Sequence, residues 1–352
     1  MVPRAAPVIR ENLSSARADP MAIAKQQAGS DSVCVLGDAA WQSFARMPAT
    51  LKRNEAMSAY LEVLAATAPA QAMQLAQAEP NLRLREHLLN AALLGWAREA
   101  PDAAAGWALT QADPSTRTKA MHAVFTGAAD HPEDAVRLGR LVCERDPAGA
   151  LEYGVALIGC LVDAGHCDVA SYVALESNPP RPIWVIEAYA KWSALQPAEA
   201  ARAVAALPEG EVPIDALRGI ANGWGEVELG GLSQFLAQLP TSGTRKELLG
   251  HALRQWVTLD PIAASKWIDG TELGPDMDEG VAAVATMSSF KPDVATSWAE
   301  SIANPQVRSE TLAIVLREWG RTDPKSAALY LAKTADLQPE ERQMVTEFFA
   351  GI

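Results

Sequence analysis

Basic residues are scarce in this chain. Its 352 residues include 30 Lys and Arg against 43 Asp and Glu, a net charge of -13. Nucleic acids bind clustered Lys and Arg, so this balance argues against a nucleic-acid partner. No apolar run approaches the roughly 18 residues of a membrane span, and residues 1–10 lack the apolar stretch of a signal peptide. We therefore expect a cytoplasmic protein without membrane insertion, or a periplasmic or secreted one if a leader has been removed.

Cysteine is scarce as well. The four cysteines are too few and too scattered for a disulfide framework in a chain of this length. Cys143, Cys160, His166 and Cys167 are close enough in sequence to suggest zinc, but they lack the short C-x-x-C spacing of zinc sites. We expect reduced thiols that pack on helices, with no metal and no other cofactor.

Catalytic signatures are absent from the sequence. The five histidines include no H-E-x-x-H pair, and neither a phosphate-binding glycine loop nor a nucleophile elbow occurs. Two carboxylate pairs, Asp276 with Asp278 and Glu340 with Glu341, are expected at helix starts, where the helix dipole favours negative charge. We expect a protein that is not an enzyme. The alternatives are an all-α enzyme with a pocket at the centre of a helical toroid, or a structural component of a cell-envelope assembly.

The chain does contain a proline that returns about every 32 residues within one apolar pattern. Less regular anchors near Gly37, Gly165 and Leu229 fill the gaps and give about ten units. Such a period is typical of stacked helical units that bury their apolar faces only against one another. We expect an irregular segment over residues 1–32, then a single all-α solenoid domain over residues 33–352. The recurring prolines are Pro69, Pro101, Pro132, Pro197, Pro261, Pro292 and Pro324.

Each unit reads as a short helix followed by a longer one. Asp260 and Pro261 are typical of a helix start, and Ala264 and Trp267 lie on one face of the short helix that follows. The longer helix ends just before the next proline and carries an apolar stripe at the i, i+3, i+4, i+7 spacing. Before Pro261 that stripe consists of Leu249, Ala252, Leu253 and Trp256.

Arginine and tryptophan also follow the period. An arginine recurs near the start of the longer helix, and its repetition predicts a structural contact between neighbouring units, because a catalytic arginine is needed only once. At least eight of the ten tryptophans follow the period and are expected in the core, whereas Trp41 and Trp184 do not and are candidates for contact with a ligand. The recurring arginines are Arg53, Arg85, Arg117, Arg181, Arg245 and Arg308.

The run DPIAASKW at residues 260–267 resembles the junction between tetratricopeptide repeats, and DPKSAALY at residues 323–330 is similar. The period here is about 32 residues rather than 34. The resemblance implies a right-handed α/α superhelix of about ten helix pairs. It also implies that the first helices line a concave groove that binds an extended peptide or a partner helix.

Transferring the groove positions onto this chain gives candidate residues that are mostly small and apolar. They fit either a dry groove for an apolar helix or a tightly wound solenoid without an open groove, and the many alanines favour the second. These candidates are Met73, Ala105, Ser265, Ile268, Thr296 and Leu331.

The C-terminal segment adds Phe349, which either packs back on the last helix pair or binds a partner or a second copy. We therefore expect a scaffold for a protein or peptide partner, basic or neutral because the chain is acidic, and a monomer or weak homo-oligomer. A scaffold should show an exposed stripe across several units, whereas an enzyme should show one pocket of converging titratable groups.

Overall fold

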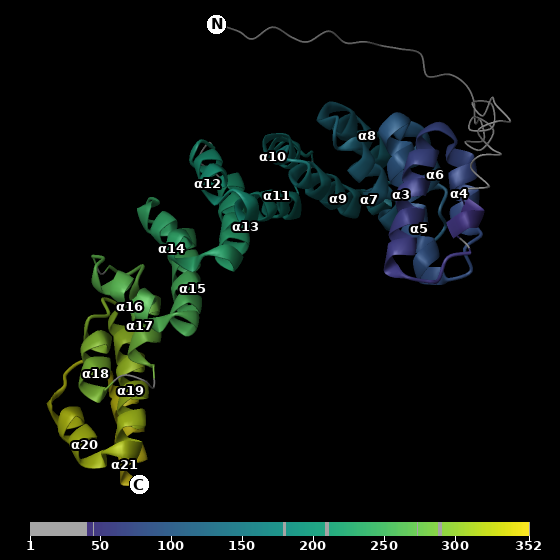
Figure 1. The fold of residues 1–352 in the computed structure, drawn as a ribbon. Coiled ribbons are helices and arrows are strands. Elements are labelled where there is room, and N and C mark those ends of the chain that lie inside the picture. Colours follow the sequence, from purple (N-terminus) through teal and green to yellow (C-terminus); the bar gives the residue numbers. More distant parts are fainter. Residues whose placement is uncertain are drawn as a thin grey trace, which may run out of the picture. The chain divides into compact units, whose positions relative to one another are not determined.

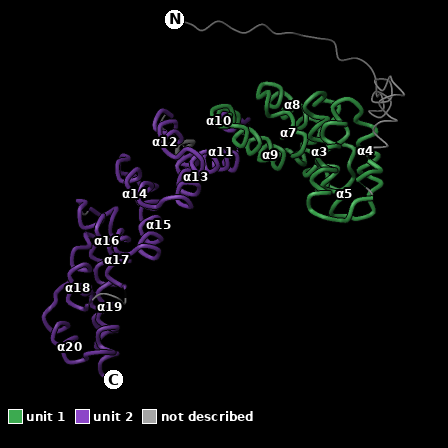
Figure 2. Tube along the Cα trace, in the orientation of Figure 1, with its two compact units in different colours: residues 1–173 green, residues 174–352 purple. Residues whose placement is uncertain are grey.

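The computed structural model describes residues 41–44, 46–178, 181–207, 211–272, 274–287 and 291–351. Regular structure in this part of the chain is all helical, with nineteen α-helices and one short 3-10 helix (Figure 1). The chain divides into two compact units, residues 1–173 and 174–352 (Figure 2). The segment expected to be irregular, residues 1–32, lies outside the described residues, as do Cys34 and Gly37.

In the first unit, helices of the two expected kinds alternate. The boundary between the units falls inside its last helix, α10. The helices are α3 (Leu51–Thr67), α4 (Pro69–Gln77), α5 (Leu82–Glu99), α6 (Pro101–Leu109), α7 (Pro114–Ala128), α8 (Pro132–Arg145), η1 (Pro147–Gly149), α9 (Ala150–Asp163) and α10 (Cys167–Leu175).

The second unit continues the alternation. Its odd-numbered helices are mostly long and its even-numbered helices are short, although α17 has only eight residues. The helices are α11 (Pro182–Leu195), α12 (Pro197–Ala205), α13 (Glu211–Val227), α14 (Leu229–Gln238), α15 (Gly243–Leu259), α16 (Pro261–Asp269), α17 (Asp278–Ala285), α18 (Pro292–Glu300), α19 (Pro305–Thr322), α20 (Pro324–Lys333) and α21 (Pro339–Ala350).

Every one of the seven recurring prolines is the first residue of a helix, as the period predicts. Proline is suited to this place because the first turn needs no backbone N–H donor. The carboxylate of Asp260 accepts a hydrogen bond from the Ala263 amide at 3.0 Å, which caps α16. The degenerate anchor at Gly165 has a φ of 87°, a conformation that glycine adopts without strain, and it ends α9 before α10 begins.

Within each unit the odd-numbered helices pack on one another in chain order. In the first unit α3, α5, α7 and α9 form such a row, and in the second α11, α13, α15, α17, α19 and α21 form another. The even-numbered helices contact mainly the odd-numbered helices beside them in sequence. This pattern of contacts between neighbours is that of a solenoid.

Glycines allow the long helices to approach closely. A Cβ atom on Gly95 of α5 would lie 1.9 Å from the carbonyl oxygen of Glu62 on α3. In the second unit, a Cβ atom on Gly223 of α13 would lie 1.9 Å from the carbonyl oxygen of Ala190 on α11. Both glycines therefore lie against the backbone of the preceding long helix, one repeat earlier in the chain.

Three of the six recurring arginines, Arg117, Arg245 and Arg308, link neighbouring repeats, as their repetition predicts. Arg245 on α15 donates a hydrogen bond from Nη1 to the Leu239 carbonyl at 2.6 Å, and its Nε lies 3.1 Å from an oxygen of Asp276 in the next unit. Arg308 makes the same two contacts, to the Ile302 carbonyl at 2.7 Å and to an oxygen of Asp336 at 3.1 Å. Arg117, in the first unit, binds the Gln111 carbonyl and Asp146 in the same way. Each of these three guanidinium groups thus joins the loop before its own helix to the next repeat.

The tryptophans that follow the period are buried or half-buried, in agreement with the expected core role. Trp256 at the end of α15 packs against Trp267 on α16, with ring centroids 5.8 Å apart. Trp319 and Tyr330 repeat this contact at 5.9 Å. These ring pairs pack between a long helix and the short helix that follows it.

Candidate functional site

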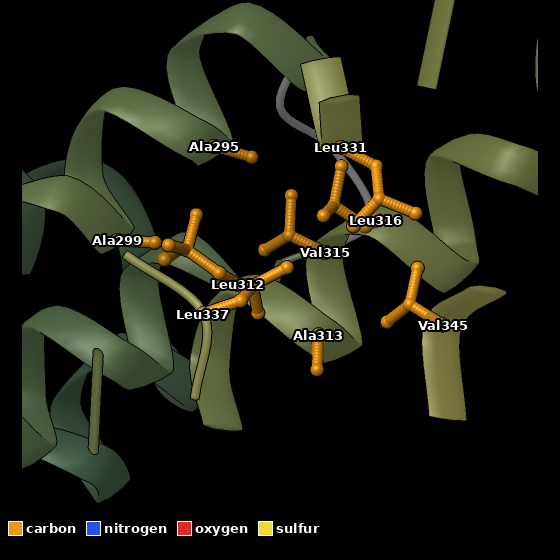
Figure 3. Close-up of a cluster of buried hydrophobic side chains, with 10 residues drawn as sticks. Ala295, Ala299, Leu312, Ala313, Val315, Leu316, Leu331, Leu337 and Val345 are labelled. Carbon is orange, nitrogen blue, oxygen red and sulfur yellow. The ribbon is translucent and has the colours of Figure 1, made fainter. Parts of the chain in front are cut away.

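The groove candidates taken from the sequence are largely buried. Only Ser265 is partly exposed, and its hydroxyl donates to the Ile262 carbonyl of its own helix at 3.2 Å. In Figure 3 the Leu331 side chain lies beside Leu316, within the same cluster as Val345. The buried candidates are Met73 on α4, Ala105 on α6, Ile268 on α16, Thr296 on α18 and Leu331 on α20. These side chains hold the short helices onto the long ones and leave little surface for a partner.

Phe349 and the two tryptophans outside the period also have contacts within the chain. The Phe349 ring occupies the space beside Gly320 of α19, so the C-terminal helix packs back on the last helix pair. Self-association through Phe349 stays a prediction. Trp184 is buried beneath the guanidinium of Arg181, 4.8 Å from the ring centroid, and Trp41 lies 6.3 Å from the ring of Tyr60.

A furrow runs along the long helices of the second unit. It is composed of three adjoining hollows of about 840, 580 and 480 Å³. The first two share Arg254 and Thr258, and the last two share Thr286, Met287 and Ile314. This long-helix furrow therefore extends from α13 across α15 and α17 to α19.

The furrow is lined by a mixture of polar and apolar side chains. Asn222, His251 and Gln255 are exposed in its first hollow, and an ion pair between Arg254 and Glu279 lies where the first two hollows meet. Such a lining offers hydrogen-bond donors and acceptors next to aliphatic surface, which suits a polypeptide better than a small apolar ligand.

An exposed apolar stripe meets the furrow at Leu259. Leu195, Val227 and Leu259 each form the last residue of a long helix, namely α11, α13 and α15, and they are spaced by the repeat period. They are 60%, 59% and 77% exposed. Leu259 also lines the first hollow of the furrow, together with Gly225 of α13. The stripe thus has one member in each of three successive repeats.

The apolar character of the stripe is not required by the repeat. The same position, two residues before the recurring proline, is occupied elsewhere by Glu99, Asp130 and Thr322. A residue that every unit needs for packing would keep its character and would be buried. Three exposed aliphatic side chains at one repeat position are therefore a candidate surface for contact with another molecule.

In the first unit a smaller hollow of about 460 Å³ lies between α8 and α10. Arg137 and Arg140 line one side of it and the exposed Tyr172 the other. Arg137 is bound to Asp102 by two hydrogen bonds of 3.0 and 3.1 Å, which raise the pKa of its guanidinium. The charged rim of this hollow therefore serves mainly to join α8 to α6.

The cysteines Cys143, Cys160 and Cys167, which were expected to be packing thiols and not zinc ligands, lie on α8, α9 and α10. Cys160 and Cys167 are buried, and the Cys160 sulfur lies 3.4 Å from the Thr126 hydroxyl and 4.0 Å from His122 Nε2. Among the described residues, no three His, Cys, Asp or Glu side chains are grouped as a metal site would require. Within the same part of the chain, no helix combines the length and apolarity needed to cross a membrane.

Comparison with known proteins gives no match, whether to family models, to curated proteins or to solved structures. The likeness to tetratricopeptide repeats therefore consists of helices packed in sequential pairs, without assignment to a family.

Proposed function

We propose that this protein is a non-catalytic scaffold that binds a protein or peptide partner on the second unit, along the apolar stripe and the adjoining long-helix furrow. The observation that carries the proposal is the row of exposed Leu195, Val227 and Leu259 across three successive units. Burying three such side chains against a partner contributes about 1.5–3 kcal/mol each before the costs of association. In this proposal the protein is cytoplasmic, and the helix pairs form a right-handed superhelix of about ten units, as the tetratricopeptide likeness implies.

The form of the furrow supports a polypeptide ligand. Its hollows follow one another over four long helices and do not converge on one point. An enzyme of the toroid class would instead gather titratable groups from several units around a single pocket. The partner-binding surface is therefore placed on the long helices, and the short helices act as supports.

The experiment is affinity capture from lysate of the native cell, using the full chain and two triple variants. The stripe variant carries Leu195→Asp, Val227→Asp and Leu259→Asp. The matched control carries Leu51→Asp, Leu82→Asp and Leu329→Asp, three leucines that are similarly exposed but belong to α3, α5 and α20, which carry no member of the stripe. Both variants add the same charge to exposed positions, so both should fold.

The proposal expects a specific protein that is captured by the wild type and the control but not by the stripe variant. Circular dichroism verifies that the two variants keep the helix content of the wild type. A partner that the stripe variant still captures would refute the assignment of the surface.

A further inference from the structure

We infer that the stripe binds a basic amphipathic α-helix whose apolar residues recur every seven positions, an inference that rests on the proposed function. The first step concerns the register of the long helices. Gly219 and Gly223 of α13 lie against the carbonyls of Ile186 and Ala190 on α11. This alignment places Val227 beside Leu195 at the ends of the two helices. Leu259, at the end of α15, lines the same hollow as Gly225 and Glu226 near the end of α13.

The second step concerns spacing. Packed helices lie about 8–10 Å apart, and α11 packs closely on α13, so Leu195 and Val227 are expected about that far apart. The contact between α13 and α15 is smaller, and Leu259 lines the same hollow as Gly225 of α13. Seven residues of an α-helix span about 10.5 Å and return to nearly the same face. A helix of about 15 residues lying across the three ends would therefore place one apolar residue over each member of the stripe.

The third step concerns charge. Glu226 and Glu228 flank Val227, and Asp260 follows Leu259, and all three carboxylates are exposed. None of them forms an ion pair with another described residue. Glu228 and Asp260 instead accept hydrogen bonds from the amides of Gly231 and Ala263. The stripe is thus bordered by acidic residues at Val227 and Leu259, and Lys or Arg beside the corresponding apolar positions of a partner would complement them.

A polyproline II segment also returns to one face at a similar spacing, about 9 Å for three residues. Grooves that bind such segments are lined by exposed aromatic rings. The members of the stripe are aliphatic, and the nearby Trp224 packs its ring against Phe235 with centroids 5.7 Å apart. The surface therefore favours the helix.

The test is fluorescence anisotropy of the full-length protein with three labelled synthetic peptides of about 18 residues. The first carries leucine at every seventh position, lysine on both sides of each leucine, and alanine and glutamine elsewhere. The second replaces each lysine with glutamate, and the third is a lysine-containing polyproline II peptide. We expect the first peptide to bind at least about tenfold more tightly than the other two, and its affinity to fall as salt is added.

Variants locate the binding. Val227→Asp should weaken binding of the basic peptide about tenfold, because one aliphatic contact is lost. Leu329→Asp, which also replaces an exposed aliphatic side chain with a carboxylate but on α20, should leave the affinity for the basic peptide unaltered. Glu226→Lys should weaken binding of the basic peptide and strengthen that of the acidic one.

The inference is overturned if the acidic or the polyproline peptide binds as tightly as the basic helix, if no peptide binds, or if Leu329→Asp weakens binding as much as Val227→Asp does. The proposed function fails separately, through the capture experiment. A captured partner that requires the stripe but binds it through an acidic or extended segment would leave the scaffold standing and remove the basic helix.

Discussion

Replacing Gly95 with alanine tests the close packing of the long helices. Alanine is the better helix former by about 0.5–1 kcal/mol, so in an open helix this change would stabilise the protein. At Gly95, however, the new Cβ would lie 1.9 Å from the Glu62 carbonyl oxygen and 2.7 Å from its carbon. Both are backbone atoms that cannot rotate away, so α5 must move from α3. Overpacking of this kind costs about 1–3 kcal/mol, and after the gain in helix propensity we expect a net loss of about 1 kcal/mol.

The matched control is Gly106→Ala on α6, where no heavy atom lies within 4 Å of the new Cβ. This change should stabilise the protein by about 0.5–1 kcal/mol. Urea unfolding followed by far-ultraviolet circular dichroism measures both variants against the wild type. The essential result is that the free energy of unfolding falls for Gly95→Ala and rises for Gly106→Ala. A Gly95→Ala variant as stable as Gly106→Ala would refute the close approach of α3 and α5.

Three further predictions concern polar contacts within and between repeats. Arg245→Ala removes the hydrogen bond to the Leu239 carbonyl and the partly buried ion pair with Asp276, so it should lower the free energy of unfolding in urea by about 1–3 kcal/mol. Arg202→Ala, which removes an exposed ion pair with Glu199, should lower it by less than about 0.5 kcal/mol. Asp278 is buried and accepts the amides of Ala303 and Asn304 at 2.8 and 2.9 Å, so Asp278→Asn should cost about 1–2 kcal/mol and speed hydrogen exchange at those amides; unchanged exchange would contradict this role. Burial and the hydrogen bond to Asp146 raise the pKa of Tyr153 from 10.0 to about 12. Stability from this neutral phenol is complete below pH 10 and declines as the pH rises towards 12, so Tyr153→Phe should make stability less dependent on pH in that range.

The repeat itself could be predicted from the sequence, because proline has a strong local preference for the first turn of a helix. The positions of Pro69 to Pro324 marked the helix starts, and the recurring arginine indicated a contact between units. Its carboxylate partners, Asp146, Asp276 and Asp336, lie in the following unit and follow no simple spacing, so only the structure identifies them. Asp276 and Asp278 were expected only to favour a helix start, whereas they also bind Arg245 and the loop before α19.

The candidate site was harder to predict. Groove positions such as Ile268 and Leu331 were taken from the short helices, but here those positions face the long helices and are buried. The stripe was missed because an apolar residue at the end of an amphipathic helix looks like part of the core. One signal was present: Leu195, Val227 and Leu259 occupy a position that is polar in several other repeats, and variation of that kind distinguishes a surface from a packing residue.

The most direct test of a partner on the stripe is photocrosslinking in the native cell, with a benzophenone amino acid in place of Val227 or, as a control, in place of Thr322. Thr322 occupies the equivalent position at the end of α19 and is also exposed. The account predicts a discrete crosslinked product of higher mass from position 227 and none from position 322. Equal products from both positions, or none from position 227, would contradict it.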